Sequence, residues 1–257
     1  MPTLHIVIPF YNEGPTIDSC ARRVVMAPLP EGWTRSLIIV DDHSRDADGR
    51  TLQDVAAGLA AEGQEIVIHR HEPNRGKGAA VQTGFDTLLA KNPPDDDVVV
   101  IQDADLEYDP ADFERLMAPL LDGTADAVIG TRWGAHRPVR GPKGRLHAWG
   151  NGLLTSLSNA MTGLRLDDME CCYKLLTVEL LRRLRPWLTE PRYGVEPQLV
   201  AALSRLGARV AQVPVSYDPR SAAEGKKIGW VDGVRAVYVI ARERLRRKPP
   251  AAAEPRS

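Results

Sequence analysis

The sequence predicts an α/β protein built around a mostly parallel mixed sheet. Short apolar runs typical of strands alternate along the chain with segments of helical spacing. Such alternation is characteristic of parallel strands joined by crossover helices. The run VVVI at residues 98–101 contains no polar residue, as expected for a strand that is buried on both faces. We therefore expect helices on both sides of the sheet, in an α/β/α sandwich.

Strands and helices alternate over the first half of the chain, and longer helices follow residue 131. Each expected strand is a run rich in aliphatic residues that ends at polar or turn-forming residues. In chain order the expected strands cover residues 4–10, 36–40, 65–71, 98–101, 127–130 and 209–217. The expected helices show apolar residues three or four positions apart. They cover residues 16–26, 51–62, 144–162, 178–185, 196–206 and 231–247, and another helix opens near residue 77.

Length and composition predict one domain without a membrane span. A chain of 257 residues can bury one large core, and no linker divides it. We expect this domain to cover residues 1–247 and the Pro- and Ala-rich tail 248–257 to be disordered. The first apolar run lacks a basic flank, and no window reaches the roughly 18 to 20 apolar residues of a span. We expect a soluble protein, or one that binds a membrane only peripherally.

Charge and cysteine content narrow the possible partners and the compartment. The formal charge is -1, which argues against nucleic acid as a partner. Three cysteines, two of them adjacent, make a poor disulfide framework. A reducing, cytoplasmic setting is therefore expected. The oligomeric state is left open by the sequence.

A D-x-D pair follows the strand at 98–101. Asp103, Asp105 and Glu107 are spaced two residues apart, so in an extended segment their side chains point the same way. Converging carboxylates suit a hard divalent cation that also binds phosphate oxygens. The alternative is a set of solvated loop acids behind a core strand. The sequence thus predicts a Mg²⁺ or Mn²⁺ site at the carboxyl edge of the sheet.

Two other loops are expected to meet the D-x-D loop, because ligands of open α/β sheets bind outside the carboxyl ends of the strands. Residues 11–13 follow the first strand and residues 41–44 follow the second. Asp41 and Asp42 can accept hydrogen bonds from a base or a ribose hydroxyl. Alternatively, this loop caps the following helix through Ser44 or Asp46.

A Gly-Lys-Gly segment opens the helix near residue 77. Free N–H groups, the helix dipole and the Lys77 charge favour an anion there. The segment is neither a Walker loop nor a G-x-G-x-x-G motif. These absences argue against a nucleoside triphosphatase and a dinucleotide-dependent dehydrogenase.

Eight motifs in order resemble the family 2 glycosyltransferases of the GT-A fold, most closely their dolichyl- or polyprenyl-phosphate mannose or glucose synthase branch. The resemblance covers about residues 4–240 and is carried by IVIPFYNE, IIVDDHS, NRGKGAAVQTGF, VVVIQDADLEYDP, AVIGTRW, DMECCYKL, YGVEPQLVAAL and EGKKIGWVDG. It implies that a hexose is transferred with inversion from a GDP- or UDP-sugar to a polyprenyl phosphate, assisted by Mg²⁺ or Mn²⁺. It also implies a donor-binding half at about 1–131 and an acceptor half at about 132–247.

The resemblance assigns roles to individual residues. The residues that it places at the nucleotide sugar are Pro9, Tyr11, Glu13, Asp41, Asp42, Lys77, Asp103 and Ala104. Asp103, Asp105 and Glu107 would face the metal, and Asp103, Asp105 and Arg132 form the catalytic set. The guanidinium of Arg132 can bind a phosphate in a bidentate way; the alternative for it is a surface ion pair. The residues expected at the acceptor or its phosphate are Arg132, Arg220, Lys226 and Lys227, of which the last three form a flap or, alternatively, a solvated charge run.

One position departs from the family pattern. Trp149 stands where dolichyl-phosphate mannose synthases commonly carry an arginine, so one contact to the acceptor phosphate is in doubt. The basic residues that could replace this contact are Arg140, Lys143, Arg145 and His147.

The acceptor decides whether the reaction needs a catalytic base. A lipid phosphate is already ionised, whereas a hydroxyl acceptor would need a carboxylate. Asp167, Asp168 and Glu170 are the candidates, and solvation of a loop or helix end is the alternative for them. Transfer to a soluble hydroxyl acceptor and an inactive nucleotide-sugar-binding protein therefore remain as alternative functions. The arginine-rich helix at 231–247 suits an anionic bilayer or, alternatively, ordinary packing against the domain.

Overall fold

The computed structural model describes residues 1–133, 141–220, 230–246 and 248–249. In this part of the chain, seven strands form one sheet in the order β3-β2-β1-β4-β6-β5-β7. The strands are β1 (Thr3–Phe10), β2 (Thr34–Asp41), β3 (Ile66–Arg70), β4 (Val98–Ile101), β5 (Ala127–Thr131), β6 (Lys174–Thr177) and β7 (Val210–Pro214). All neighbouring strands are parallel except that β6 runs antiparallel to both β4 and β5. The expected mostly parallel mixed sheet is confirmed.

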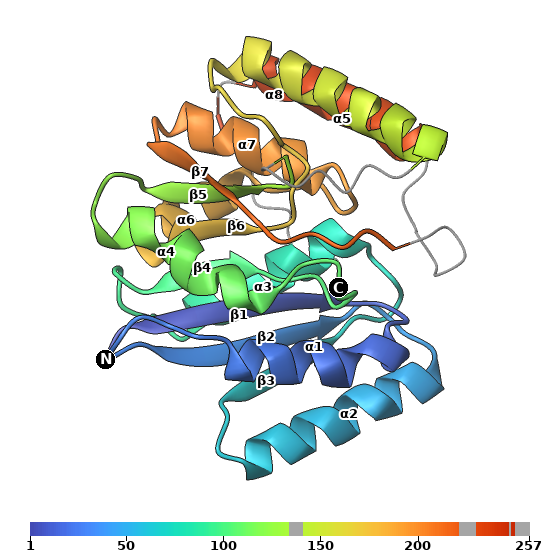
Figure 1. Ribbon diagram of the computed structural model, residues 1–257, viewed down its shortest axis with the longest axis vertical. Helices are drawn as coiled ribbons and strands as arrows, with labels where there is room; N and C mark the ends of the chain where they lie inside the picture. The colour runs from blue at the N-terminus through green and yellow to red at the C-terminus, as the bar shows by residue number, and fades with distance from the viewer. Residues whose placement is uncertain (134–140, 221–229, 247, 250–257) are drawn as a thin grey trace.

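Helices cover both faces of the sheet (Figure 1). In the view of Figure 1, α1 (Gly14–Met26), α2 (Asp46–Ala61) and α4 (Phe113–Leu121) lie in front of it, while α3 (Lys77–Ala90) and α6 (Val178–Leu184) lie behind. At the top, α5 (Gly141–Thr162) and α8 (Trp230–Leu245) form an outer layer over the buried helix α7 (Val195–Arg205). Two short 3-10 helices, η1 (Pro110–Asp112) and η2 (Arg185–Trp187), complete the described elements. No described helix is both long and apolar enough to cross a membrane.

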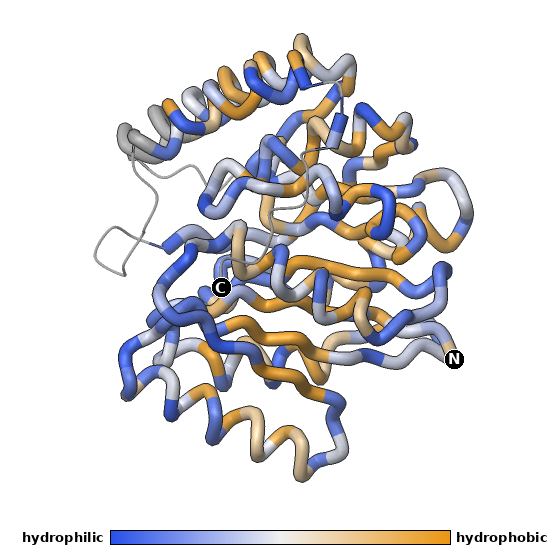
Figure 2. Tube along the Cα trace, turned by 180° about the vertical axis from the view of Figure 1, so that it is seen from behind, coloured by the Kyte–Doolittle hydropathy of each residue, from blue (hydrophilic) through white to orange (hydrophobic). Residues whose placement is uncertain are grey.

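The core lies on both sides of the central strands, which appear as hydrophobic bands in Figure 2. All four residues of β4 are buried, because it lies between β1 and β6 and is covered by helices on both faces. The helix α3 packs tightly on β1, because a Cβ added at Gly84 would lie 2.3 Å from Val7 Cγ1. A glycine at this position lets the helix backbone approach the strand.

Among the strands and α-helices, β6 and α4 were not predicted from the sequence. The strand β6 is only four residues long and begins at Lys174, whose charge hides the apolar pattern. In the structure Lys174 is buried because it pairs with Glu196, a residue that is distant in sequence. The other expected elements are present, with ends that differ from the structure by a few residues. Apart from Lys248 and Pro249, the expected disordered tail lies outside the described residues.

Candidate active site

A cleft of about 310 Å³ opens at the carboxyl ends of β1, β2 and β4. The three expected loops all contribute to it, and the second half of the chain closes its other side. Its lining includes these residues of the first half of the chain: Pro9, Phe10, Tyr11, Glu13, Asp42, Asn74, Gly76, Lys77, Ala80, Asp103, Ala104, Asp105, Glu107 and Tyr108. From the second half come Arg132, Glu170, Cys172, Arg192, Tyr193, Glu196, Tyr217 and Arg220. Asp41 lies outside this lining.

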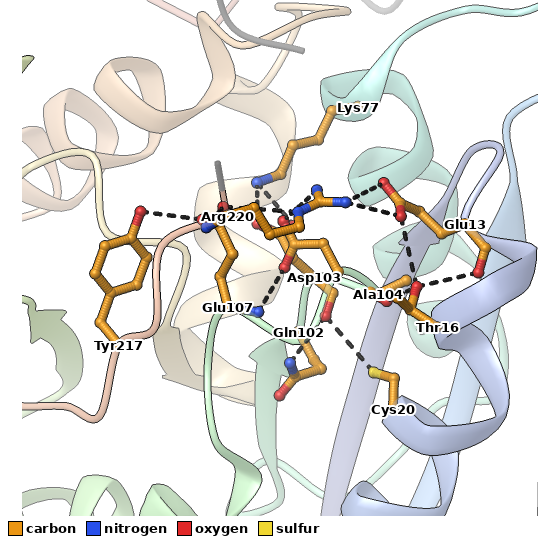
Figure 3. Close-up of polar contacts among 11 residues, drawn as sticks. Glu13, Thr16, Cys20, Lys77, Gln102, Asp103, Ala104, Glu107, Tyr217 and Arg220 are labelled. Carbon is orange, nitrogen blue, oxygen red and sulfur yellow. Dashed lines mark hydrogen bonds and ion pairs between the residues drawn. The ribbon is translucent and has the colours of Figure 1, made fainter. Parts of the chain in front are cut away.

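Arg220 covers an acidic cluster that is formed by Glu13, Asp105 and Glu107. Figure 3 shows its guanidinium beside Glu13. Its guanidinium lies 3.0 Å from Glu13 Oε2 and 2.9 Å from Asp105 Oδ2, and its backbone N–H donates to Glu107 Oε1. The Tyr217 hydroxyl donates to the second oxygen of Glu107 at 3.0 Å. Burial and the neighbouring charges of Asp103 and Glu107 raise the pKa of Asp105 to about 7. Negative charge is therefore concentrated at this end of the cleft.

Lys77 begins a buried chain of alternating charges. Its ammonium group lies 2.9 Å from the carboxylate of Asp103 and 3.2 Å from Glu196 Oε1. Glu196 in turn pairs with the buried Lys174. Burial would lower the pKa of Lys77, but the carboxylates of Asp103 and Glu196 outweigh it, and the pKa lies well above the ordinary value. Lys77 is therefore a fixed positive charge next to the D-x-D loop.

The mouth of α3 is partly covered by the chain around Pro191. The backbone N–H of Ala79 donates to Pro191 O at 2.9 Å, and a Cβ at Gly78 would lie 2.2 Å from Glu190 O. Gly76 has a φ of +96°, a conformation that favours glycine. The glycines thus allow residues 190–192 to close over this helix end, and the Lys77 charge reaches the cleft from there.

Asp42 holds the loop that precedes α3. Its two carboxylate oxygens accept hydrogen bonds from Asn74 Nδ2, Arg75 N and Gly76 N, and they lie 2.7 Å from the His71 ring at the closest. Burial would raise the pKa of Asp42, but these hydrogen bonds and His71 lower it. Since about four partners saturate a carboxylate, Asp42 fixes the shape of this wall of the cleft.

The neighbouring residues of this loop have their own contacts. Asp41 accepts from Ser44 N and from Arg70, both at 2.8 Å. The alternative in which Ser44 or Asp46 caps a helix is wrong, because α2 begins at Asp46 behind Arg45 and has no side-chain cap. The Ser44 hydroxyl instead accepts from Asn12 N and so ties the first loop to the second.

Arg132, which lines the cleft, forms a buried bidentate pair with Asp168. Arg132 Nε and Nη2 each lie 2.7 Å from one oxygen of Asp168, which has no exposed surface. Asn151 of α5 donates to the same carboxylate. The centroid of the Tyr217 ring lies 5.2 Å from the guanidinium carbon of Arg132. The alternative of a surface ion pair for Arg132 is therefore wrong. Arg132 lines the cleft with its guanidinium held in one orientation.

The three candidate bases occupy different environments. Asp168 is committed to Arg132, whereas Asp167 is exposed and does not line the cleft. Glu170 lines the cleft, and burial together with the nearby charge of Glu196 raises its pKa to about 7.

Several predicted residues cannot be placed at the site. Arg140, Lys226 and Lys227 lie outside the described residues, as do the side chains of Lys143, Arg145 and His147. Trp149 is largely exposed on α5 and does not line the cleft.

Sequence reasoning missed Tyr193 and Glu196, both from the motif YGVEPQL. The signal for Glu196 was an acidic residue at the start of a helix that is otherwise apolar. Its role became visible only when the fold brought Lys77 and Lys174 to it.

The acidic cluster fits a divalent cation in its chemistry. Asp103, Asp105 and Glu107 supply hard oxygen ligands, and a cation there would relieve the repulsion that the charges of Asp103 and Glu107 exert on Asp105. Among the described residues, however, no three acidic, His or Cys side chains form a ready-made metal cluster. The carboxylates point instead at Lys77 and Arg220. A cation would take over charges that these two side chains now neutralise.

The mostly parallel mixed sheet and the cleft at its carboxyl edge are those of the GT-A fold. Glucosyl-3-phosphoglycerate synthase from Mycobacterium tuberculosis, solved in complex with Mn²⁺, UDP and phosphoglyceric acid, superposes with a TM-score of 0.66. It is 22% identical, and the match covers 96% of this chain and 80% of that one. This likeness shows the fold.

The chain belongs to glycosyl transferase family 2, whose sequence pattern matches residues 5–185. It is 30% identical over 236 residues to the undecaprenyl-phosphate mannosyltransferase of Micrococcus luteus, covering 91% of this chain and 90% of that protein. It is also 26% identical to the dodecaprenyl-phosphate galacturonate synthase of Rhizobium johnstonii, covering 84% of this chain and 59% of that relative.

Proposed function

We propose that this glycosyltransferase moves a hexose, mannose or glucose, from a GDP- or UDP-sugar to a polyprenyl phosphate, with inversion and with the help of Mg²⁺ or Mn²⁺. The observation that carries the proposal is the division of charge across one cleft. An acidic cluster suited to a metal and a diphosphate and the oriented guanidinium of Arg132 both line this cleft, and Tyr217 contacts each of them. Relatives named as polyprenyl-phosphate sugar transferases support the lipid acceptor.

On the donor side, Pro9, Tyr11 and Glu13 line the part of the cleft where the nucleoside would bind. Asp103, Asp105 and Glu107 would hold the metal, which when bound neutralises the departing diphosphate as a Lewis acid. Lys77 and Arg220 lie beside these carboxylates and can offer their charges to the same diphosphate.

On the acceptor side, Arg132 would bind the lipid phosphate. Asp168 and Asn151 hold Arg132, so its fork is oriented before the acceptor arrives. One phosphate oxygen attacks the anomeric carbon while the bond to the donor diphosphate breaks, and the diphosphate leaves with the bonding electron pair. Because the attacking phosphate is already ionised, this step needs no base.

The outer helices supply a surface through which the enzyme would reach a lipid acceptor, on the cytoplasmic face of the membrane. The α5–α8 surface consists of exposed apolar side chains with arginines beside them. Its apolar members are Trp149, Leu153, Val234, Val237, Tyr238 and Leu245. The inner side of α8 packs on the domain through Ala236, Val239 and Ile240. The helix can therefore pack on the domain and still present its outer side to a membrane. Apolar and basic groups together favour an anionic bilayer.

Vesicle binding tests the α5–α8 surface. We expect the protein to sediment with phosphatidylglycerol vesicles at low salt and to be released by salt. The double variant Trp149→Ser/Tyr238→Ser should sediment several-fold less. Leu121→Ser is the matched control, because Leu121 is also exposed but belongs to α4. Equal binding of the control and the double variant would exclude this surface.

Release of nucleoside diphosphate tests the function. GDP- and UDP-sugars would be supplied with Mn²⁺ or Mg²⁺, with and without a short-chain polyprenyl phosphate in detergent. Release that the lipid phosphate stimulates and a chelator abolishes is the expected result. Metal-dependent release that is indifferent to the lipid would indicate a soluble acceptor. No release from any donor would indicate a nucleotide-sugar-binding protein.

A further inference from the structure

Glu170 differs from the other carboxylates in the described lining of the cleft. Each of the others has a partner: Glu13, Asp105 and Glu107 contact Arg220, Asp103 and Glu196 contact Lys77, and Asp42 accepts from the loop that it holds. No described group donates a hydrogen bond to Glu170, and its Oε1 is fully buried. Among the described residues, Glu170 is therefore a carboxyl without a partner, and it lines the cleft near Arg132.

The cations near Glu170 are already neutralised. Lys174 of β6 pairs with Glu196 of α7, and Arg132 after β5 pairs with Asp168 of the loop that also carries Glu170. Among the described residues, these four have the largest charge effects on Glu170, and they contain two positive and two negative charges. An ionised Glu170 would be a buried charge without compensation, which is costly unless the group takes up a proton.

Protonation changes what Glu170 can do. The neutral acid has an O–H group that donates a hydrogen bond, whereas the ionised form only accepts. Its pKa of about 7 places the change between the two forms in the neutral range. A phosphate held by Arg132 would offer acceptor oxygens to the protonated form and would be repelled by the ionised form.

We propose that Glu170 is an acceptor-binding residue whose protonated carboxyl donates a hydrogen bond to the phosphate that Arg132 holds, so that its ionisation weakens acceptor binding. This inference rests on the proposed function. Glu170 would then favour a phosphate acceptor only while its own carboxyl is protonated. A catalytic base for a hydroxyl acceptor would need the opposite protonation state.

The test compares the KM for a short-chain polyprenyl phosphate across pH in the wild type and in Glu170→Gln. Glutamine keeps a hydrogen-bond donor at this position but does not titrate. With a pKa of about 7, the protonated fraction of Glu170 falls about thirtyfold between pH 6 and pH 8.5. The ratio of wild-type KM to variant KM should rise by up to this factor, while kcat and the KM for the donor sugar do not follow it. Taking the ratio cancels the ionisation of the acceptor itself.

Asp167→Asn is the matched control, because Asp167 is an exposed acid three residues away and does not line the cleft. Its KM ratio to the wild type should be independent of pH. The wild-type profile is a second measurement that needs no variant: its acceptor KM should rise through neutral pH more steeply than the ionisation of the phosphate explains.

Three outcomes would overturn the inference. A KM ratio for Glu170→Gln that is independent of pH would show that Glu170 does not act through its proton. Loss of turnover in Glu170→Gln with a soluble hydroxyl acceptor, and activity rising with pH in the wild type, would assign Glu170 as a base. Absence of turnover with any polyprenyl phosphate would overturn the proposed function itself, and the inference with it.

Discussion

Breaking the Arg132–Asp168 pair should destabilise the protein far more than breaking a similar pair on its surface. Asp168→Asn removes the negative charge but keeps the size of the side chain, and it leaves a buried guanidinium without a counter-charge. Losing one partner of a buried pair costs about 3–5 kcal/mol of the free energy of unfolding. We therefore expect the melting temperature to fall by about 6 °C or more, at roughly 2–4 °C per kcal/mol for a domain of this size.

The chain offers a matched control in Asp126, which also binds an arginine, Arg209, through both of its oxygens. This pair is exposed, so Asp126→Asn should cost about 1 kcal/mol or less. Urea unfolding followed by circular dichroism measures both variants. Equal losses in Asp126→Asn and Asp168→Asn would refute the reasoning, because burial would then make no difference.

The Arg132–Asp168 pair should also make the stability of the protein depend on pH. Burial would raise the pKa of Asp168, but Arg132 and Asn151 outweigh it and lower the pKa. A lowered folded-state pKa gives stability that is present above the unfolded pKa of about 4 and is lost as the pH falls through the folded value. The difference in the free energy of unfolding between the wild type and Asp168→Asn should therefore shrink below about pH 4. A stability difference that does not change in acid would contradict this assignment.

Two further substitutions test the packing and the metal site. Gly84→Ala places a Cβ 2.3 Å from Val7 Cγ1 and should cost about 1–3 kcal/mol in urea unfolding, whereas Gly58→Ala meets open space and should stabilise by up to about 1 kcal/mol. A destabilisation no larger in Gly84→Ala than in Gly58→Ala would refute the packing argument. Asp105→Asn should abolish metal-dependent release of nucleoside diphosphate, since it removes a charged ligand from the acidic cluster. Unchanged turnover would exclude Asp105 as a metal ligand.

Local pattern was sufficient to predict the strands that are buried on both faces. β4 was predicted at 98–101, and the structure has it at Val98–Ile101, because four aliphatic residues in a row have few alternatives in an α/β chain. β6 could not be found in this way. Its first residue, Lys174, is stable in the core only because Glu196 meets it there, and that contact depends on the complete fold.

The candidate site also has features that the local sequence predicts and features that depend on the complete fold. Asp103, Asp105 and Glu107 share a cleft with the first loop, as expected for loops at the carboxyl ends of neighbouring strands. The expected extended conformation of this segment is wrong, because residues 104–105 form a turn and Leu106 has a φ of +64°. The sequence could not show that Asp42 is saturated by residues 74–76, nor that Asp168 is committed to Arg132. Both facts depend on hydrogen bonds between segments that are about thirty residues apart.

The distribution of charge in the cleft connects these observations. Arg220 and Lys77 neutralise carboxylates of the D-x-D loop, and Asp168 neutralises Arg132. In the proposed reaction Asp105 and Glu107 would hold the metal, and Arg220, which contacts both of them, could offer its charge to the diphosphate. Arg132 is different, because its bidentate partner Asp168 is fully buried and does not line the cleft. Its orientation therefore does not depend on groups that bind in the cleft. Under the proposed function, this suits the phosphate that must stay aligned while the donor diphosphate leaves.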